Sequence, residues 1–140
     1  MRRIARALER TRRRKVGSVD RAGVATWMEA YRHAWVSNDP AEVADLFTED
    51  AVYALDAFAR PWQGREDIVR RWTAGISQQV EVEWQIEALD GDVAVVHWVV
   101  VTRNAGDPVR VQYDGILVIR FASDGRCREL REWFFRREMR

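Results

Sequence analysis

The sequence predicts an α+β domain in which three N-terminal helices pack on a strongly curved antiparallel or mixed sheet. Two observations indicate this class. The first half repeats apolar residues at the spacing of helices, whereas the second half alternates polar and apolar residues as strands do. The 140 residues, 47% of them hydrophobic, correspond to about one domain with a substantial core.

The first two helices follow one another closely. Apolar side chains recur every three or four positions in residues 24–36, which is typical of an amphipathic helix. Within "SNDP", Asp39 suits the cap of a second helix and Pro40 suits its first turn. We expect Leu46 and Phe47 to belong to the buried side of that second helix.

A short strand and a third helix come next. The apolar segment "AVYAL" is predicted to be the strand, and Gly64 precedes the helical segment "REDIVRRWTAGI". Glu66 and Asp67 suit the positive N-terminal end of this helix. Four strands of an antiparallel meander follow, separated by the turns "DGD", "NAGDP" and "SDG": residues 80–89, 93–103, 109–121 and 126–135.

Charge is unevenly distributed along the chain. Eight of the first 15 residues are Arg or Lys and only Glu9 is acidic, which leaves 15 basic against 21 acidic residues in the remainder. We therefore expect residues 1–19 to form a flexible basic tail and residues 20–140 to form a single domain. Such a tail could bind nucleic acid or an anionic surface, or it could be solvated or no part of the native product. Because the remainder shows no helix-turn-helix, zinc-finger pattern or basic stripe, we do not expect a nucleic-acid partner.

Residue types also bear on location and cofactors. Cys127 is the single cysteine, which excludes an internal disulfide and a multi-cysteine zinc site. No run approaches the roughly 18 apolar residues of a membrane span, so we expect a cytoplasmic protein that does not bind membranes. The two histidines, His33 and His97, are not spaced as metal ligands. We expect neither a metal nor another cofactor.

An internal pocket follows from the predicted architecture. An antiparallel sheet that curls around helices on one side leaves a cone, which is a natural cavity for a small apolar molecule. Seven tryptophans are available for its walls, and we expect Trp62 to be its lid. The aromatic residues predicted to line or cover the pocket are Tyr31, Trp35, Tyr53, Phe58, Trp62, Trp72 and Trp84.

Three segments carry a resemblance to a known family: "YRHAWVSNDPAEVADLFTEDAVY", "PWQGREDIVRRW" and "YDGILVIRFASDGRCRELREWFF". On these segments the chain from about Gly23 to Phe135 resembles the SnoaL-like branch of the nuclear transport factor 2 superfamily. That superfamily includes polyketide cyclases, ketosteroid isomerase, limonene epoxide hydrolase and scytalone dehydratase. The resemblance implies the cone-shaped fold, but it does not imply one activity, because the same cone hosts unrelated chemistries and non-catalytic binders.

Ketosteroid isomerase gives a partial match. Tyr31 falls where that enzyme has its oxyanion-binding tyrosine. The general base falls on Leu55, with Asp56 one residue later, and the protonated acid of the oxyanion hole falls on Leu117. Two of the three catalytic groups are therefore missing, and steroid-type isomerisation is not expected. The resemblance leaves Leu117 as an apolar residue of the cavity.

Limonene epoxide hydrolase gives a different partial match. Glu132 falls where that enzyme has an aspartate that faces the cavity from the last strand. The family's arginine and second aspartate are replaced by Val99 and Val101, which would line the cavity, so epoxide opening by that mechanism is not expected. Glu132 could instead pair with Arg131 or Arg103 at the edge of the sheet.

The same resemblance places a histidine in the cavity. If Val99 points inward, the two-residue period of a strand turns His97 inward as well, and Trp98 and Val100 point outward. His97 would then lie across the sheet from Glu132 and could act as a base or an acid. Scytalone dehydratase also uses cavity histidines. The alternative is a core histidine that donates to a backbone carbonyl or a tyrosine.

Two aspartates remain. Asp56 follows the first strand in "LDAFARPW", where it could cap local backbone N–H groups in a turn. If that loop bulges, Asp56 could instead turn inward and replace the missing base. Asp114 precedes Gly115 and alternates with Leu117, which predicts a structural role on the opposite face unless a bulge intervenes.

Two classes of function stay open. The first is a cofactor-independent enzyme that transfers protons on a small apolar substrate, using His97, Glu132 or Asp56, with Tyr31 polarising an oxygen. The second is a non-catalytic binding or dimerisation module. The resemblance implies a homodimer through the outer face of the sheet, and an outward Trp133 is consistent with it.

Overall fold

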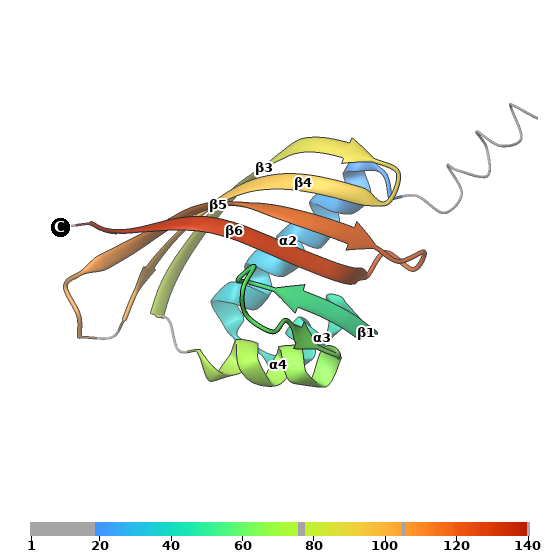
Figure 1. Ribbon diagram of the computed structural model, residues 1–140. Helices are drawn as coiled ribbons and strands as arrows, with labels where there is room; N and C mark the ends of the chain where they lie inside the picture. Colours follow the sequence, from blue (N-terminus) through green and yellow to red (C-terminus); the bar gives the residue numbers. More distant parts are fainter. Residues whose placement is uncertain (1–18, 76–77, 105, 140) are drawn as a thin grey trace, which may run out of the picture.

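A computed structural model describes residues 19–75, 78–104 and 106–139 (Figure 1). The basic segment at the N-terminus, residues 1–15, lies outside the described residues. Within them, no helix is long and apolar enough to cross a membrane. The described elements are α2 (Arg21–Ser37), α3 (Pro40–Asp45), β1 (Phe47–Ala54), β2 (Trp62–Gln63), α4 (Arg65–Ala74), β3 (Gln78–Asp90), β4 (Val93–Arg103), β5 (Arg110–Phe121) and β6 (Cys127–Met139).

The strands form one mixed sheet in the order β2-β1-β6-β5-β4-β3. β1 pairs with β6 in parallel, and every other neighbouring pair is antiparallel. The sheet curves over α2, while α3 and α4 lie beside β1 and β2 at one end (Figure 1). The predicted α+β class, with three helices on a curved mixed sheet, is confirmed for the described residues, and so is the meander β3 to β6.

The helix α2 is placed by its ends and by one apolar side. Asp20 accepts a hydrogen bond from the Gly23 N–H at 2.7 Å, which satisfies one of the free donors of the first turn. Asn38 ends the helix in the left-handed conformation, with φ at 53°. The buried side of α2 consists of Val24, Trp27, Met28, Tyr31 and Ala34.

The boundary between α3 and β1 differs from the prediction. α3 ends at Asp45, and Phe47 already belongs to β1 rather than to the helix. The carbonyl of Leu46 accepts hydrogen bonds from Trp27 Nε1 at 3.0 Å and from the Cys127 N–H at 2.8 Å. These tertiary bonds override the helical pattern of the sequence. The two-residue strand β2 was also not predicted, because its partner Tyr53 lies across a loop.

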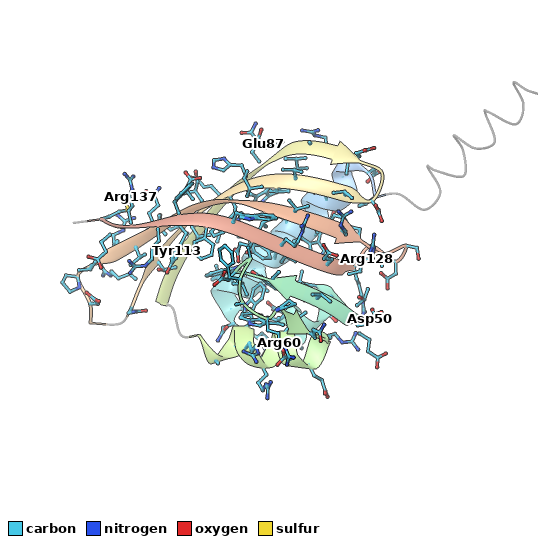
Figure 2. The ribbon with its side chains drawn as sticks, viewed as in Figure 1. Asp50, Arg60, Glu87, Tyr113, Arg128 and Arg137 are labelled. Atoms are coloured by element: carbon cyan, nitrogen blue, oxygen red, sulfur yellow. The ribbon has the colours of Figure 1, made fainter. Side chains whose placement is uncertain are left out.

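The two faces of the sheet differ sharply, and the cross-strand register defines them. On the inner face, which α2 covers, Leu117 pairs with Glu132 and both are buried. On the outer face, His97 pairs with Ile116, and Ile116 pairs with Trp133. Figure 2 shows Arg137, another outer residue, extending from β6 on the side away from α4. The face to which a residue belongs therefore decides whether it can take part in an internal site.

Candidate active site

A cavity of about 220 Å³ lies at the end of the sheet where the helices α2 and α4 end. Its inner end reaches Tyr53 on β1, which is only 2% exposed, and its outer end is formed by the exposed residues Arg71 and Gly75. The cavity is lined by Trp35, Asn38, Tyr53, Leu55, Trp62, Arg71, Trp72 and Gly75. Trp35, Tyr53, Trp62 and Trp72, which the sequence suggested for the pocket, are among these residues.

The aromatic walls of the cavity pack against one another. The rings of Tyr53 and Trp62 lie 5.0 Å apart, and those of Trp35 and Trp72 lie 5.9 Å apart in an edge arrangement. Trp72 also meets Tyr53 edge-on at 6.3 Å. Such contacts fix ring orientations better than aliphatic packing does. The cavity is thus a rigid aromatic box with one open end.

Glu132 lies behind this box on the inner face of β6. It is 5% exposed, and its Oε2 accepts a hydrogen bond from the Tyr53 hydroxyl at 3.0 Å. Burial raises the pKa of the Glu132 carboxyl from 4.5 to about 7, and the Tyr53 hydrogen bond opposes this shift only partly. A carboxyl with such a pKa exchanges protons readily near neutral pH.

Tyr31, predicted to line the pocket, is instead fully buried outside the cavity lining, where it supplies a second hydroxyl near Glu132. Burial first, and the charge of Glu132 second, hold the pKa values of Tyr31 and Tyr53 well above 10, so both hydroxyls stay protonated and can donate. The Tyr31 hydroxyl approaches Trp35 and Tyr53, but it makes no hydrogen bond to any described residue, and neither does Trp35 Nε1. Two buried donors without acceptors leave room for an acceptor on a bound molecule.

His97 does not face this site, so the predicted inward orientation was wrong. Its side chain is 39% exposed on the outer face, where Nε2 lies 2.7 Å from Asp114 Oδ1. Trp98 and Val100, predicted to point outward, are buried instead. β4 is apolar on both faces, so alternation alone does not tell which face is buried, and a shift of one residue exchanges them. Val99 shares the outer face with His97, which corrects its assignment to the cavity.

The loop after β1 bears on the predictions for three residues, Asp56, Phe58 and Trp62. Asp56 is exposed and accepts a hydrogen bond from the Phe58 N–H at 2.9 Å, so it is the turn carboxylate and not a replacement base. The Phe58 side chain is fully exposed and lines nothing. This loop leads into β2, which sets Trp62 beside Tyr53 in the wall of the box rather than over it as a lid.

Two further residues lie away from the cavity. Trp84 is half-buried on β3, and its Nε1 donates to Glu29 of α2 at 3.1 Å. Leu117 is fully buried beside Glu132 and belongs to the core, not to the cavity lining. Asp114 lies on the face opposite Leu117, as the alternation predicted.

Sequence reasoning missed four lining residues: Asn38, Leu55, Arg71 and Gly75. Asn38 and Gly75 follow the ends of α2 and α4, and only the tertiary packing brings these ends together. A signal for Arg71 did exist, because it directly precedes Trp72, which was assigned to the pocket.

The side chains that could bind a metal do not gather at one place in the described residues. The described residues contain no group of three or more His, Cys, Asp or Glu that could hold a metal ion. His33 pairs with Glu42 at 2.7 Å on the exposed side of α2. Cys127 is buried, and burial raises the pKa of its thiol far above the usual range.

Comparison with known proteins now gives the family. Residues 28–130 match the family model described as SnoaL-like domain. The chain belongs to the SnoaL-like domain family. No curated protein matches the sequence significantly.

Solved structures support the fold of this SnoaL-like domain. An LEH-like epoxide hydrolase from M. tuberculosis is 22% identical, with 81% of this chain and 84% of that chain covered at a TM-score of 0.64. A putative scytalone dehydratase from Novosphingobium aromaticivorans is 16% identical, with 85% and 87% covered at 0.69. A computationally designed 17-OHP binder is 14% identical, with 83% and 96% covered at 0.68. At these identities the likeness concerns the fold alone.

Proposed function

We propose that this SnoaL-like domain is a cofactor-independent enzyme that transfers protons on a small apolar substrate, with Glu132 as the acid–base group. The observation that carries the proposal is the position of Glu132. Its buried carboxyl lies behind an aromatic cavity and contacts that cavity through the Tyr53 hydroxyl. A pKa of about 7 lets the carboxyl accept a proton and return it within one cycle.

The neighbouring donors complete the chemistry. A substrate oxygen near Tyr31 and Trp35 would accept the hydrogen bonds that both groups lack. When a proton leaves the carbon next to a substrate carbonyl, negative charge develops on that oxygen, and the two donors stabilise it. The proton reaches Glu132 through Tyr53: the Tyr53 oxygen takes the proton from the carbon while the hydroxyl proton of Tyr53 moves to Glu132 Oε2, and the return step reverses both transfers. Return of the proton to a different carbon isomerises the substrate, and loss of a neighbouring hydroxyl as water dehydrates it.

Hydrogen–deuterium exchange tests proton transfer without knowledge of the final product. Small enolisable ketones are incubated with the protein in D₂O, and deuterium entry at the carbon next to the carbonyl is followed by NMR. We expect the wild-type protein to accelerate exchange and Glu132→Gln to abolish the acceleration. Asp56→Asn changes an exposed carboxylate and should exchange like wild type. Equal acceleration by Glu132→Gln and wild type would remove Glu132 from the mechanism.

A non-catalytic binding module is the second candidate, and one contact favours it. Tyr53 stands between the cavity and Glu132 and already donates to that carboxyl. The designed 17-OHP binder shows that this fold also exists as a binder. In that case bound ligands would change the fluorescence of Trp35, Trp62 and Trp72, but no ketone would exchange faster than in buffer.

We also propose a homodimer through the outer face of the sheet. Trp133 is 47% and Phe135 86% exposed there, and the partly exposed Val99 lies in the same face. Strands that are apolar on both faces are typical of sheets covered on both sides. Analytical ultracentrifugation should find a dimer that Phe135→Glu dissociates. Phe58→Glu is the matched control, because Phe58 is fully exposed elsewhere, and equal behaviour of both variants contradicts this interface.

We also propose a cytoplasmic location. The sequence has one cysteine, Cys127, and its thiol is buried, so no disulfide within the chain stabilises the fold. Such proteins suit a reducing compartment. Cell fractionation tests this directly, and recovery outside the cytoplasm would contradict it.

A further inference from the structure

The open end of the cavity carries a positive charge that the proposed proton transfer does not use. Arg71 lines the cavity from the last turn of α4, and its side chain is 53% exposed. Its Nε donates to Asp67 Oδ1 at 3.0 Å, one turn earlier in the same helix. This bond holds the guanidinium beside the cavity while it occupies one of the five donors of the group.

Asp67 offers a natural comparison within the same helix. It also accepts a hydrogen bond from Arg70, so both arginines share one carboxylate. Arg70 is 74% exposed and does not line the cavity, whereas Arg71 does. The two residues therefore carry the same charge and the same partner, and they differ in access to a bound molecule.

The backbone carbonyls at the open end are already engaged. Asn38 Nδ2 donates to the carbonyls of Thr73 and Gly75 at 3.2 and 3.4 Å, and the Gly75 N–H donates to the carbonyl of Trp72. Free carbonyls at a helix C-terminus would attract a cation. With these carbonyls bound by Asn38 and Gly75, the donors that the described part of the open end still offers are the outer nitrogens of Arg71, and Asn38 Oδ1 is an acceptor beside them.

The inner end presents donors as well. Trp35 Nε1 is a donor only, and it has no acceptor among the described residues. The Tyr31 hydroxyl lies beside it, behind the lining, and contacts Trp35 and Tyr53 without hydrogen-bond geometry. The cavity thus offers the outer nitrogens of Arg71 at its open end and Trp35 Nε1 in its wall, with aromatic rings between them.

We propose that Arg71 selects the substrate, and that the cavity takes an apolar molecule with a carboxylate at its outer end and a second hydrogen-bond acceptor at its inner end. The carboxylate pairs with the outer nitrogens of Arg71, and the apolar part lies against Trp35, Trp62 and Trp72. The inference rests on the proposed function, since it names the substrate class for the same cavity. It makes Arg71 a specificity residue and gives it no part in proton transfer.

Three probes of one shape but different charge test this selection: 3-phenylpropionate, 3-phenylpropionamide and 3-phenylpropylamine. Dissociation constants are measured from tryptophan fluorescence at pH 6 and low salt. We expect the carboxylate to bind about two- to fivefold more tightly than the amide, which is the usual gain from an ion pair with a half-exposed guanidinium. The amine should bind more weakly than the amide.

Variants of the two arginines then locate the effect. Arg71→Gln should remove the preference for the carboxylate and leave the affinity for the amide unchanged. Arg70→Gln also removes one arginine from Asp67, but it leaves Arg71 in place and should preserve the preference. Circular dichroism confirms that both variants are folded.

The possible failures are distinguishable. Selection by Arg71 is overturned if the carboxylate and the amide bind equally, if the two variants have equal effects, or if the amine binds most tightly. None of these results bears on the cavity or on the acid–base proposal. If none of the probes binds, the assigned substrate class is wrong. The exchange experiment with Glu132→Gln tests the acid–base proposal separately.

Discussion

Two titratable side chains on β4 and β6, two strands that β5 separates in one sheet, have opposite surroundings. Glu132 lies on the inner face, 5% exposed, with a single hydrogen bond from Tyr53. His97 lies on the outer face, 39% exposed, with Asp114 as its partner at 2.7 Å. By residue type the histidine is the more usual acid–base group at neutral pH. The carboxyl is nevertheless the group whose pKa the fold shifts toward neutrality.

Which face of its strand a residue occupies therefore affects its pKa more here than its residue type does. Burial raises the pKa of Glu132 to about 7, into the range that suits proton transfer. The His97–Asp114 pair is open to solvent, where such pairs contribute little.

Neighbouring residues on the two faces of β5 should respond differently to truncation. Leu117 is fully buried beside Glu132, so Leu117→Ala should lower the free energy of unfolding by about 2–5 kcal/mol. Ile116 is only partly buried on the outer face, and Ile116→Ala should lower it by clearly less. Urea denaturation at low protein concentration measures both. Equal losses would show that the two faces do not differ as described.

Stability should depend on pH through Glu132. Between about pH 4.5 and 7 the unfolded chain loses this proton while the folded protein keeps it, so the free energy of unfolding falls as pH rises through that window. The total contribution is about 3 kcal/mol, fully present below pH 4.5 and lost above about 7. Glu132→Gln removes it. The difference between the wild-type and variant curves measures the effect, and a flat difference contradicts the raised pKa.

Loss of the outer pair should have the smallest effect. Asp114→Asn and His97→Gln each remove one partner of an exposed contact, so the melting temperature should stay essentially unchanged. Both variants should also retain wild-type deuterium exchange with ketones. A large loss of stability or of deuterium exchange in either variant would show that the His97–Asp114 pair contributes to folding or to proton transfer.

The sequence predicted the elements well because their signals are local. Apolar spacing located α2, the Asp39 and Pro40 pair located α3, and turn residues separated the four long strands. The face of β4 could not be predicted in the same way. Its residues are apolar on both sides, so the pattern from Val93 to Val101 fits either orientation.

The candidate site was predictable only in part. Glu132 alternates with the exposed Trp133 on β6, and its position in the family pattern indicated the inner face correctly. The open end depends on Asn38 and Arg71, which belong to different helices. Their approach results from the packing of α2 against α4 and β1, and no single segment of sequence encodes it.

The pKa of Glu132 itself tests the central claim most directly. Glutamate labelled with ¹³C at the side-chain carboxyl is incorporated, and the chemical shifts are followed by NMR from pH 3 to 9. The resonance that Glu132→Gln removes identifies the residue. A midpoint near 7 supports a buried acid–base group behind the aromatic cavity, whereas a midpoint at or below 4.5 would contradict it.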